Sequence, residues 1–331
     1  MEFKNGKVKA LGLCSGGLDS ILAALVLRRQ GIEVEWIVFE TPFFSSEKAC
    51  RAARLNRVPI RVRKILPVYL KMLKNPPAGY GKQMNPCMDC HALMFRLAGE
   101  EMKAGGFDFL FSGEVSGQRP MSQNRNSLRY VEKNSGFDGY IVRPLSARNL
   151  PVTFPEKEGL VDREHLLNFS GRSRKPQFEL AEKLGVTDFP SPAGGCLLTE
   201  KGYATRLKDL FSHQDDYRDA ELYLLGYGRH LRLNEGHKLI VGRSKAENEK
   251  IEKLIDSAVD TEFKVKNWPG PVSLVPNGCG SLMVKRAAAI CAGYSKAPSG
   301  KPAEVLVIKG GRETSLTVIP TAPVENKAFL L

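Results

Sequence analysis

Two groups of residues in the N-terminal part of the chain have the types and the spacing that chemistry requires. The first is the run Ser15-Gly16-Gly17-Leu18-Asp19-Ser20, which follows an apolar stretch at 8–13 and precedes a helix-like stretch at 21–29. A strand, a glycine turn and a helix in this order favour a phosphate cradle, because glycine lets successive N–H groups converge on an anion. The run lacks the Gly-Lys-Ser/Thr ending of a Walker A loop and the third glycine of a dinucleotide fingerprint. An ordinary turn with a Ser or Asp cap is the plain alternative.

The second group consists of cysteines. Cys87 and Cys90 stand at the start of a helix-like segment, and Cys196 follows two glycines. Two cysteines three apart at a helix start can face one metal ion, and the helix N-terminus favours thiolates. Three thiolates that hold an iron–sulfur cluster with one open iron fit this count best. A zinc site with His91 as fourth ligand, and a pair of buried structural cysteines, remain open alternatives.

The spacing Cys87-x-x-Cys90-His91 also spells the attachment motif of c-type haem, but that chemistry requires an exported protein. The N-terminal residues lack the apolar core of a signal peptide, and no run of 18 apolar residues could span a membrane. We therefore expect a cytoplasmic protein, whose seven cysteines serve as thiols or ligands rather than in disulfides. Cys14, Cys50, Cys279 and Cys291 have no partner spacing and are expected to be small core residues.

The order of elements predicts an α/β fold with a doubly wound parallel sheet. Strand-like and helix-like segments alternate along 8–13, 21–29, 34–39, 47–55, 60–65, 91–103 and 107–111, and a further helix is expected at 175–184. The segment 143–156 is interpreted as an extended connection. Ligands in such sheets bind beyond the carboxyl ends of the strands. We expect the glycine loop and the segments after Phe39 and Phe111 to meet in one cleft.

A Pro/Gly-rich break at 188–196 indicates a domain boundary. We expect a nucleotide-binding domain over 1–190 and a smaller α+β domain over 191–331. In the second domain the pattern predicts helices at 203–213 and 246–259, a strand pair near 239–241, and a hairpin formed by 305–308 and 315–319. The 331-residue chain has a formal net charge of +13, which favours a polyanionic partner such as RNA.

The chain resembles the PP-loop ATP pyrophosphatases through its Ser15–Ser20 run, and within them the branch that thiolates tRNA. The shared elements are that run, Asn85-Pro86-Cys87-x-x-Cys90, Gly113-Glu114-x-x-Gly117-Gln118 with Ser122-Gln123, and Arg143-Pro144-Leu145. Their order is closer to the 4-thiouridine synthases than to the 2-thiouridylases. The resemblance covers roughly the first 200 residues. We expect neither the N-terminal RNA-binding module usual in 4-thiouridine synthases nor a C-terminal sulfurtransferase domain.

The resemblance implies an ATP-dependent tRNA sulfurtransferase that forms AMP and pyrophosphate. ATP adenylates a uridine oxygen, and sulfide then displaces AMP. The product that the resemblance favours is 4-thiouridine. The implied cofactors are ATP, Mg²⁺ and a 4Fe–4S cluster held by Cys87, Cys90 and Cys196, which with Asp19 are the expected catalytic residues. Asp19 would help to hold Mg²⁺. The expected ATP-binding residues are Ser15, Gly16, Gly17, Leu18, Asp19, Ser20, Phe39, Gly113 and Gln118, while Ser122 and Gln123 would line the nucleotide or uridine site or satisfy a turn.

The expected partners are tRNA and either sulfide or a sulfur-donor protein, with no membrane; a homodimer is compatible with the sequence. Basic and aromatic residues in the second half suit RNA. The RNA-binding candidates are Arg172, Arg174, Lys175, Arg206, Arg229, Arg232 and Arg243. The alternatives left open are 2-thiouridine synthesis, a persulfide mechanism on Cys90 or Cys196, a PP-loop amidoligase with structural zinc, and a nucleotide- and RNA-binding protein without chemistry.

Overall fold

A computed structural model describes residues 7–119, 121–190 and 195–331. The chain divides into two compact units, Met1–Cys196 and Leu197–Leu331. Part of the expected Pro/Gly-rich boundary, residues 191–194, lies outside the described residues, as do residues 1–6 of the expected cytoplasmic N-terminus. Each unit has its own sheet and its own core, and the two are described separately below.

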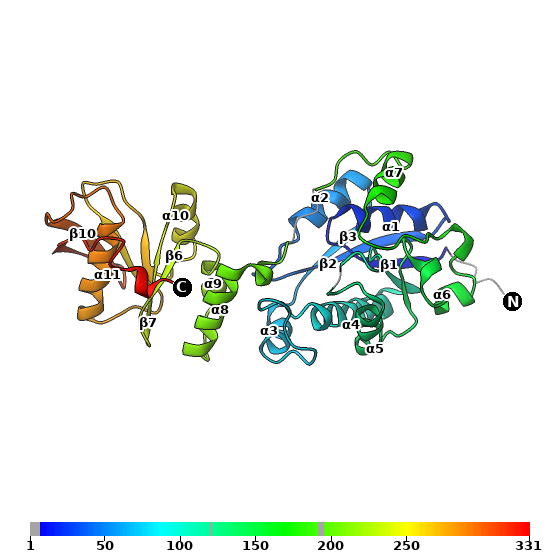
Figure 1. Cartoon of the computed structure of the whole chain (residues 1–331), viewed down its shortest axis with the longest axis horizontal. Helices are drawn as coiled ribbons and strands as arrows, with labels where there is room; N and C mark the ends of the chain where they lie inside the picture. The colour runs from blue at the N-terminus through cyan, green and yellow to red at the C-terminus, as the bar shows by residue number, and fades with distance from the viewer. Residues whose placement is uncertain (1–6, 120, 191–194) are drawn as a thin grey trace. The chain divides into compact units, whose positions relative to one another are not determined.

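The first unit is built on a parallel sheet, which confirms the predicted α/β class (Figure 1). Its strands are β1 (Lys9–Leu13), β2 (Glu33–Glu40), β3 (Ile60–Lys64), β4 (Phe109–Ser112) and β5 (Ile141–Val142), in the order β3-β2-β1-β4-β5. Every neighbouring pair is parallel. Because β1 is central, the loop that follows it opens at the middle of the carboxyl edge. A Cβ on Gly12 would stand 2.2 Å from the Phe111 ring, so glycine lets the side chain of β4 lie across β1.

Helices cover both faces of this sheet (Figure 1). On one face lie α1 (Leu18–Arg28), α2 (Glu47–Asn56) and α7 (Lys175–Lys183), and on the other lie α3 (Leu66–Lys74), α4 (Cys87–Gly105) and α5 (Arg125–Ser135). α1 is buried nearly all round, as its unbroken apolar sequence requires, and α7 packs against it through Leu180 and Leu184. The segment 143–156 is less extended than predicted, because it contains the short helices η1 (Ala147–Asn149) and α6 (Phe154–Lys157); η2 (Arg163–His165) follows it.

The second unit is an antiparallel sheet flanked by helices. Its strands are β6 (Arg229–Asn234), β7 (His237–Val241), β8 (Thr261–Val265), β9 (Ser273–Val275), β10 (Ala303–Lys309) and β11 (Arg312–Val318), in the order β11-β10-β8-β9-β7-β6. Its helices are η3 (Leu197–Thr199), α8 (Lys201–His213), α9 (Asp219–Leu224), α10 (Lys245–Glu252), α11 (Ser281–Gly293) and η4 (Lys327–Phe329). The predicted strand pair and the hairpin β10–β11 are confirmed.

Alternation along the strands divides the core of the second unit between the two faces of the sheet. Leu239 and Val241 join the cluster under α11, whereas Ile240 joins the cluster with Ile251 of α10. The helix predicted over 246–259 is wrong in length: α10 ends at Glu252, and the chain turns through Asp256 before β8. In the described parts of the chain, no helix has both the length and the apolar character needed to cross a bilayer.

Candidate active site

The three segments expected to share a cleft meet at the carboxyl edge of the parallel sheet. A Cβ on Gly16 of the glycine loop would stand 2.3 Å from the backbone of Lys48, at the start of α2. A Cβ on Gly113, which follows β4, would stand 2.4 Å from the backbone of Asp19. The loop is therefore held between the segments after β2 and β4, and only glycine permits both approaches. Gly16 also has φ +74°, a conformation that L side chains rarely adopt.

The glycine loop is held by its own hydrogen bonds and leads directly into the N-terminus of α1. Gly17 is the N-cap of α1 and supplies no side chain to the first turn of the helix. Within the loop, the Ser20 hydroxyl accepts a hydrogen bond from the Ser15 backbone N–H at 3.3 Å, and the Gly16 N–H donates to Cys14 Sγ at 3.3 Å. Free helix N–H groups and the positive end of the helix dipole favour a phosphate at this position.

Asp19 is the centre of a polar network that reaches α7. Its Oδ2 accepts a hydrogen bond from Gln118 Nε2 at 2.8 Å, and its Oδ1 lies 3.5 Å from the Arg174 guanidinium. Gln118 in turn accepts a hydrogen bond from Gln177 Nε2 at 2.7 Å. Gln177 is 1% exposed, so the carboxylate of Asp19 is held in place from the protein side by groups with little freedom. The structure thus brings the predicted ATP-binding Gln118 and the predicted RNA-binding Arg174 to one carboxylate.

Several buried polar atoms around this network have no partner among the described residues. They are Arg174 Nε, Gln177 Oε1 and Gln123 Oε1. Ser122 and Gln123 are both buried, in the loop after β4. Of the other predicted ATP-binding residues, Leu18 and Phe39 are 1% and 4% exposed, so the surrounding protein already covers both side chains.

Cys87 and Cys90 occupy the first turn of α4, and each sulfur accepts a hydrogen bond. Asn85 Nδ2 lies 3.1 Å from Cys87 Sγ, and the Tyr69 hydroxyl lies 3.6 Å from Cys90 Sγ. Burial, together with the nearby thiols of Cys196 and Cys87, raises the pKa of the Cys90 thiol to about 12, although the Tyr69 hydrogen bond opposes this. The thiol of Cys196 therefore lies within electrostatic range of Cys90, 106 positions away in sequence (196 − 90).

These cysteines are gathered in one region without forming a closed ligand set. Among the described residues, no three Cys, His, Asp or Glu side chains stand close enough to share a metal ion. The imidazole of His91, the residue after Cys90, is held by Glu114 instead: its Nδ1 lies 2.8 Å from Glu114 Oε1.

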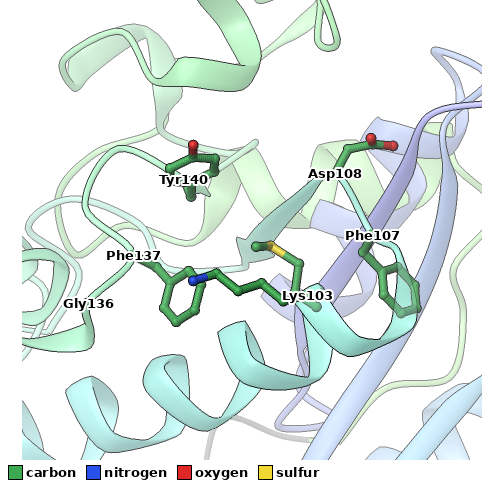
Figure 2. A pocket seen from close by; sticks show the side chains of 7 residues that line it. Lys103, Phe107, Asp108, Gly136, Phe137 and Tyr140 are labelled. Carbon is green, nitrogen blue, oxygen red and sulfur yellow. The ribbon is translucent and has the colours of Figure 1, made fainter. Parts of the chain in front are cut away.

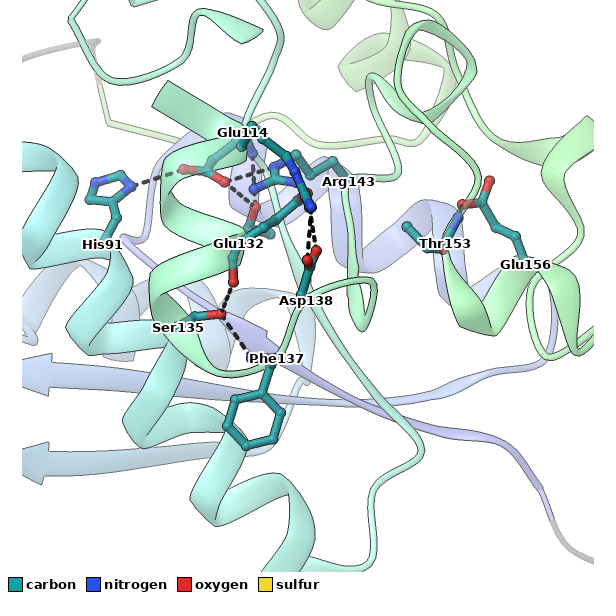
Figure 3. A network of polar contacts seen from close by, with 11 residues as sticks. His91, Glu114, Glu132, Ser135, Phe137, Asp138, Arg143, Thr153 and Glu156 are labelled. Carbon is teal, nitrogen blue, oxygen red and sulfur yellow. Dashed lines mark hydrogen bonds and ion pairs between the residues drawn. The ribbon is translucent and has the colours of Figure 1, made fainter. Parts of the chain in front are cut away.

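Glu114 connects the cysteine helix to the end of the sheet (Figure 3). Its Oε2 accepts a hydrogen bond from Arg143 Nε at 2.9 Å, and Arg143 is also paired with Glu132 of α5. Burial alone would raise the pKa of Glu114, but the charge of Arg143 and the hydrogen bond with His91 outweigh burial and lower it to about 2. Arg143, from the predicted Arg-Pro-Leu element, is 2% exposed and stays inside this network.

The segment from Gly113 to Gln118 therefore touches both candidate centres. Gly113 packs on the backbone of Asp19 and Gln118 binds its carboxylate, while Glu114 binds the histidine that follows Cys90. Six consecutive residues place the phosphate loop and the cysteine helix side by side. This continuity follows from the fold, because α4 runs back from the carboxyl edge and β4 returns to it.

The arginines proposed for RNA differ in how far they are already engaged. Arg232 Nε donates to Asp209 at 2.9 Å, and Arg243 Nε donates to Glu247 at 2.9 Å. Arg206 donates to the Leu225 carbonyl at 2.9 Å and is partly buried. Arg229 lies over the Tyr294 ring at 5.0 Å from its centroid. Arg172 and Lys175 are exposed on either side of Arg174.

A pocket of about 360 Å³ lies away from the candidate active site (Figure 2). It is lined by Lys103, Phe107, Asp108, Phe137 and Tyr140, and Asp108 bonds the backbone of Lys9 at the start of β1. The amino ends of the parallel strands are opposite the edge that carries the phosphate loop. Lys103 Nζ lies 4.9 Å from the centroid of the Phe137 ring, so the ammonium group already contacts an aromatic residue that lines the pocket.

Three residues of the site carried no usable signal in the sequence. Gln177 is an ordinary polar residue of a helix, and Tyr69 belongs to α3, which the sequence pattern did not predict. His91 was considered as a metal ligand, whereas its contact with Glu114 depends on the pairing of distant segments. Glu114 belongs to the Gly-Glu-x-x-Gly-Gln element. Its position shortly after a buried strand is the signal that could have identified it as a site residue.

Comparisons with known proteins match the two parts of the chain to two different families. Residues 5–149 match the family described as thiamine biosynthesis protein (ThiI), and residues 228–330 match the NFACT protein RNA binding domain. The chain is 25% identical over 245 residues to a protein named tRNA-specific 2-thiouridylase MnmA 2 from Thermoanaerobacter sp. (strain X514), covering 66% of this chain and 64% of that one. It thus spans somewhat less than two thirds of the length of that relative.

A protein named probable tRNA sulfurtransferase from the same organism is 30% identical over 146 residues, covering 41% of this chain and 36% of that one. Among solved structures, a 4-thiouridine synthetase–RNA complex with bound ATP is similar with a TM-score of 0.37 and 22% identity, covering 54% of this chain and 41% of that one. The N-terminal part of the chain is therefore similar, in its sequence matches and in its parallel sheet with the Ser-Gly-Gly-Leu-Asp-Ser loop, to PP-loop proteins that thiolate tRNA.

Proposed function

We propose that the protein is an ATP-dependent tRNA sulfurtransferase that replaces a uridine oxygen by sulfur. The observation that carries the proposal is the segment Gly113–Gln118, which joins the phosphate loop to the cysteine helix. An enzyme that must activate an oxygen with ATP and then deliver sulfur to the same carbon needs both centres within reach of one base. The matches to thiolating relatives and to an RNA-binding domain support the same assignment.

The first step is adenylation. The uridine carbonyl oxygen attacks the α-phosphorus of ATP, and pyrophosphate leaves. We assign the phosphates to the glycine loop, where the first-turn N–H groups of α1 face the anion. Asp19, positioned by Gln118, would hold Mg²⁺, and the Arg174 guanidinium beside it would stabilise the phosphate charge that develops in the transition state.

The second step is sulfur transfer. Hydrosulfide adds to the activated carbon and AMP leaves with the former uridine oxygen, so one C=O bond becomes C=S. Cys87, Cys90 and Cys196 supply three sulfur donors in one region, and the hydrogen bonds from Asn85 and Tyr69 would orient the sulfurs of Cys87 and Cys90 as ligands. We propose that these three cysteines hold a 4Fe–4S cluster, which when bound would supply the sulfide from its open iron. The contact between His91 and Glu114 fixes the first turn of α4 relative to the segment after β4.

We propose that the oxygen replaced is the one at position 4 of uridine. We assign 4-thiouridine, because the Gly-Glu-x-x-Gly-Gln element with Ser122-Gln123 is closer to the 4-thiouridine synthases. The test is nucleoside analysis by mass spectrometry of unmodified tRNA incubated anaerobically with the protein, ATP, Mg²⁺ and sulfide. Wild-type protein should yield 4-thiouridine, and an Asp19→Ala variant should not. A digest that contains 2-thiouridine would correct the position, and a digest with no thiolated nucleoside would refute the function.

A further inference from the structure

Five strands of the antiparallel sheet in the second unit share one end of the sheet. Aromatic and basic residues lie beside this end. The register places Arg229 opposite Val241, Val241 opposite Ser273, and Ser273 opposite Phe263. The start of β6, the ends of β7 and β8, and the starts of β9 and β10 therefore share this end, and the C-terminal residues of α11 pack beside it. We call this region the aromatic end.

Three aromatic rings lie at the aromatic end, two of them already in contact with a cation. The Arg229 guanidinium lies 5.0 Å from the centroid of Tyr294, and Lys250 Nζ lies 5.1 Å from that of Tyr227. Both tyrosines also pack against the hydrophobic clusters of the unit. Trp268 differs, because it belongs to neither of those clusters and is 42% exposed. The exposed face of the Trp268 ring is therefore available for stacking by a ligand.

The turn that carries Trp268 is held in place. The Lys296 backbone N–H donates to the Pro269 carbonyl at 2.8 Å, and a Cβ on Gly270 would stand 2.8 Å from Ser295 Cβ. Close packing against the residues after α11 fixes the turn next to Tyr294. The Trp268 ring is therefore presented from a rigid support, which reduces the entropy lost when a ligand packs on it.

The charges at the aromatic end leave cations available to a ligand. Lys266 is paired with Glu304, and Lys264 is paired with Glu252 and Glu262, so the carboxylates nearest to β8 are already used. Lys296 and Lys301 are exposed and have no carboxylate partner among the described residues. An exposed ring beside unpaired ammonium groups matches a ligand that has both flat apolar faces and negative charges.

We propose that the aromatic end is a stacking platform for unpaired nucleotides of RNA, with a base on Trp268 and phosphates on Lys296 and Lys301. Bases within an A-form helix have their faces covered by their neighbours, so a protein ring can stack only on bases that are unpaired. The inference rests on the proposed function for the presence of RNA. It adds the place and the mode of recognition, which the predicted arginines at 232 and 243 do not supply because carboxylates hold them.

Tryptophan fluorescence reports on this platform directly. The chain has two tryptophans, and Trp36 is 0% exposed in the core of the first unit, so Trp268 accounts for the solvent-exposed emission. Titration of the full-length protein with a single-stranded RNA oligonucleotide should quench this emission. The same sequence annealed into a duplex should quench it far less at equal nucleotide concentration. Quenching of equal depth and affinity by both forms would overturn the proposal.

Affinity measurements with variants complete the test. Trp268→Ala should weaken binding of the single strand by roughly 5- to 150-fold, the range for loss of one stacked base. Trp268→Phe should keep most of the affinity, and Lys296→Gln should lower the salt dependence. Leu282→Ala and Lys285→Gln are matched controls, because both side chains are exposed in the first half of α11, away from this end.

The outcomes separate this inference from the proposed function. Equal affinity of wild type and Trp268→Ala, in a protein that still thiolates tRNA, would overturn the platform and leave the function standing. A wild-type protein that binds neither single-stranded RNA nor tRNA would overturn both.

Discussion

The guanidinium of Arg174 lies 3.5 Å from the carboxylate of Asp19, although the two residues are 155 positions apart. The contact joins the phosphate loop to the residue that precedes α7, and both side chains are less than one fifth exposed. This contact leaves the carboxylate and the guanidinium side by side at the phosphate loop. In the absence of nucleotide each group neutralises the other, and a bound nucleotide offers each a new partner.

Replacing Asp19 should remove the adenylation step and keep the fold. In Asp19→Asn the side chain can still bond Gln118, but it loses the charge that would hold Mg²⁺. We expect tRNA-dependent release of pyrophosphate to fall by about 100-fold or more, since a metal supplies several kcal/mol of transition-state stabilisation. The thermal midpoint should stay near that of the wild type. Undiminished pyrophosphate release in this variant would contradict the role of Asp19.

Replacing Arg174 should affect ATP chemistry and not RNA affinity. Arg174→Gln removes the charge beside Asp19, and we expect pyrophosphate release to slow by roughly 100-fold, as for the loss of one transition-state donor. Arg172→Gln is the matched control, because Arg172 is exposed two residues earlier and has no contact with Asp19. A salt titration of tRNA affinity in which only Arg174→Gln weakens binding would return Arg174 to the RNA-binding group.

The cysteine variants should separate activation from sulfur transfer. Alanine at Cys87, Cys90 or Cys196 should abolish thiolation and lower the iron and sulfide content of anaerobically purified protein, while tRNA-dependent pyrophosphate release continues. The two activities separate because the phosphate loop is a distinct element. Cys50→Ala is the control, since Cys50 lies in α2 away from the cysteine helix. Full thiolation by the Cys196→Ala variant would remove Cys196 from the site.

Glu114 should make the stability of the first unit depend on pH. Its pKa is about 2 in the folded protein against an ordinary value of 4.5, so its stabilising effect is complete above 4.5 and is lost as the pH falls toward 2. Glu114→Gln should cost about 3 kcal/mol of unfolding free energy at pH 7, because it leaves Arg143 buried with one partner fewer. The difference in unfolding free energy between wild type and Glu114→Gln should become smaller below pH 4.5.

Urea denaturation from pH 7 to pH 3 measures this effect. The control is Glu100→Gln, since Glu100 is exposed on α4 and forms no ion pair with another described residue. A difference between wild type and Glu114→Gln that stays constant over the whole pH range would show that the Glu114 carboxylate is not the stabilising group.

The sequence predicted the parallel sheet because alternating strand and helix patterns need only local information. It also singled out Asp19 and Gln118 near glycine turns, and the structure brings these two side chains into hydrogen-bond contact, while their roles in ATP binding stay predictions. It could not place Arg174 on Asp19, because a basic residue at a helix start is equally suited to solvent, RNA or phosphate. The α10 helix was predicted too long, since the polar residues after Glu252 continue a helical pattern that the turn at Asp256 interrupts.

The contacts of Glu114 could not be predicted from the sequence either. A carboxylate, an arginine and a histidine at 114, 143 and 91 carry no spacing signal, because their contact is created by the pairing of β4 with β5 and by the return of α4. The cysteines were grouped from their count and from the Cys-x-x-Cys spacing, and the resemblance to a known family supported Cys196 as the distant ligand. Their electrostatic proximity in the structure is a tertiary property that spacing alone does not encode.

The central claim is that one site couples ATP cleavage to sulfur insertion. The most direct measurement counts AMP, pyrophosphate and thiouridine formed from the same anaerobic reaction with unmodified tRNA and sulfide. We expect equal amounts of the three products, with AMP and thiouridine both absent when tRNA is omitted. Formation of ADP and phosphate, or of AMP and pyrophosphate from tRNA without any thiouridine, would contradict it.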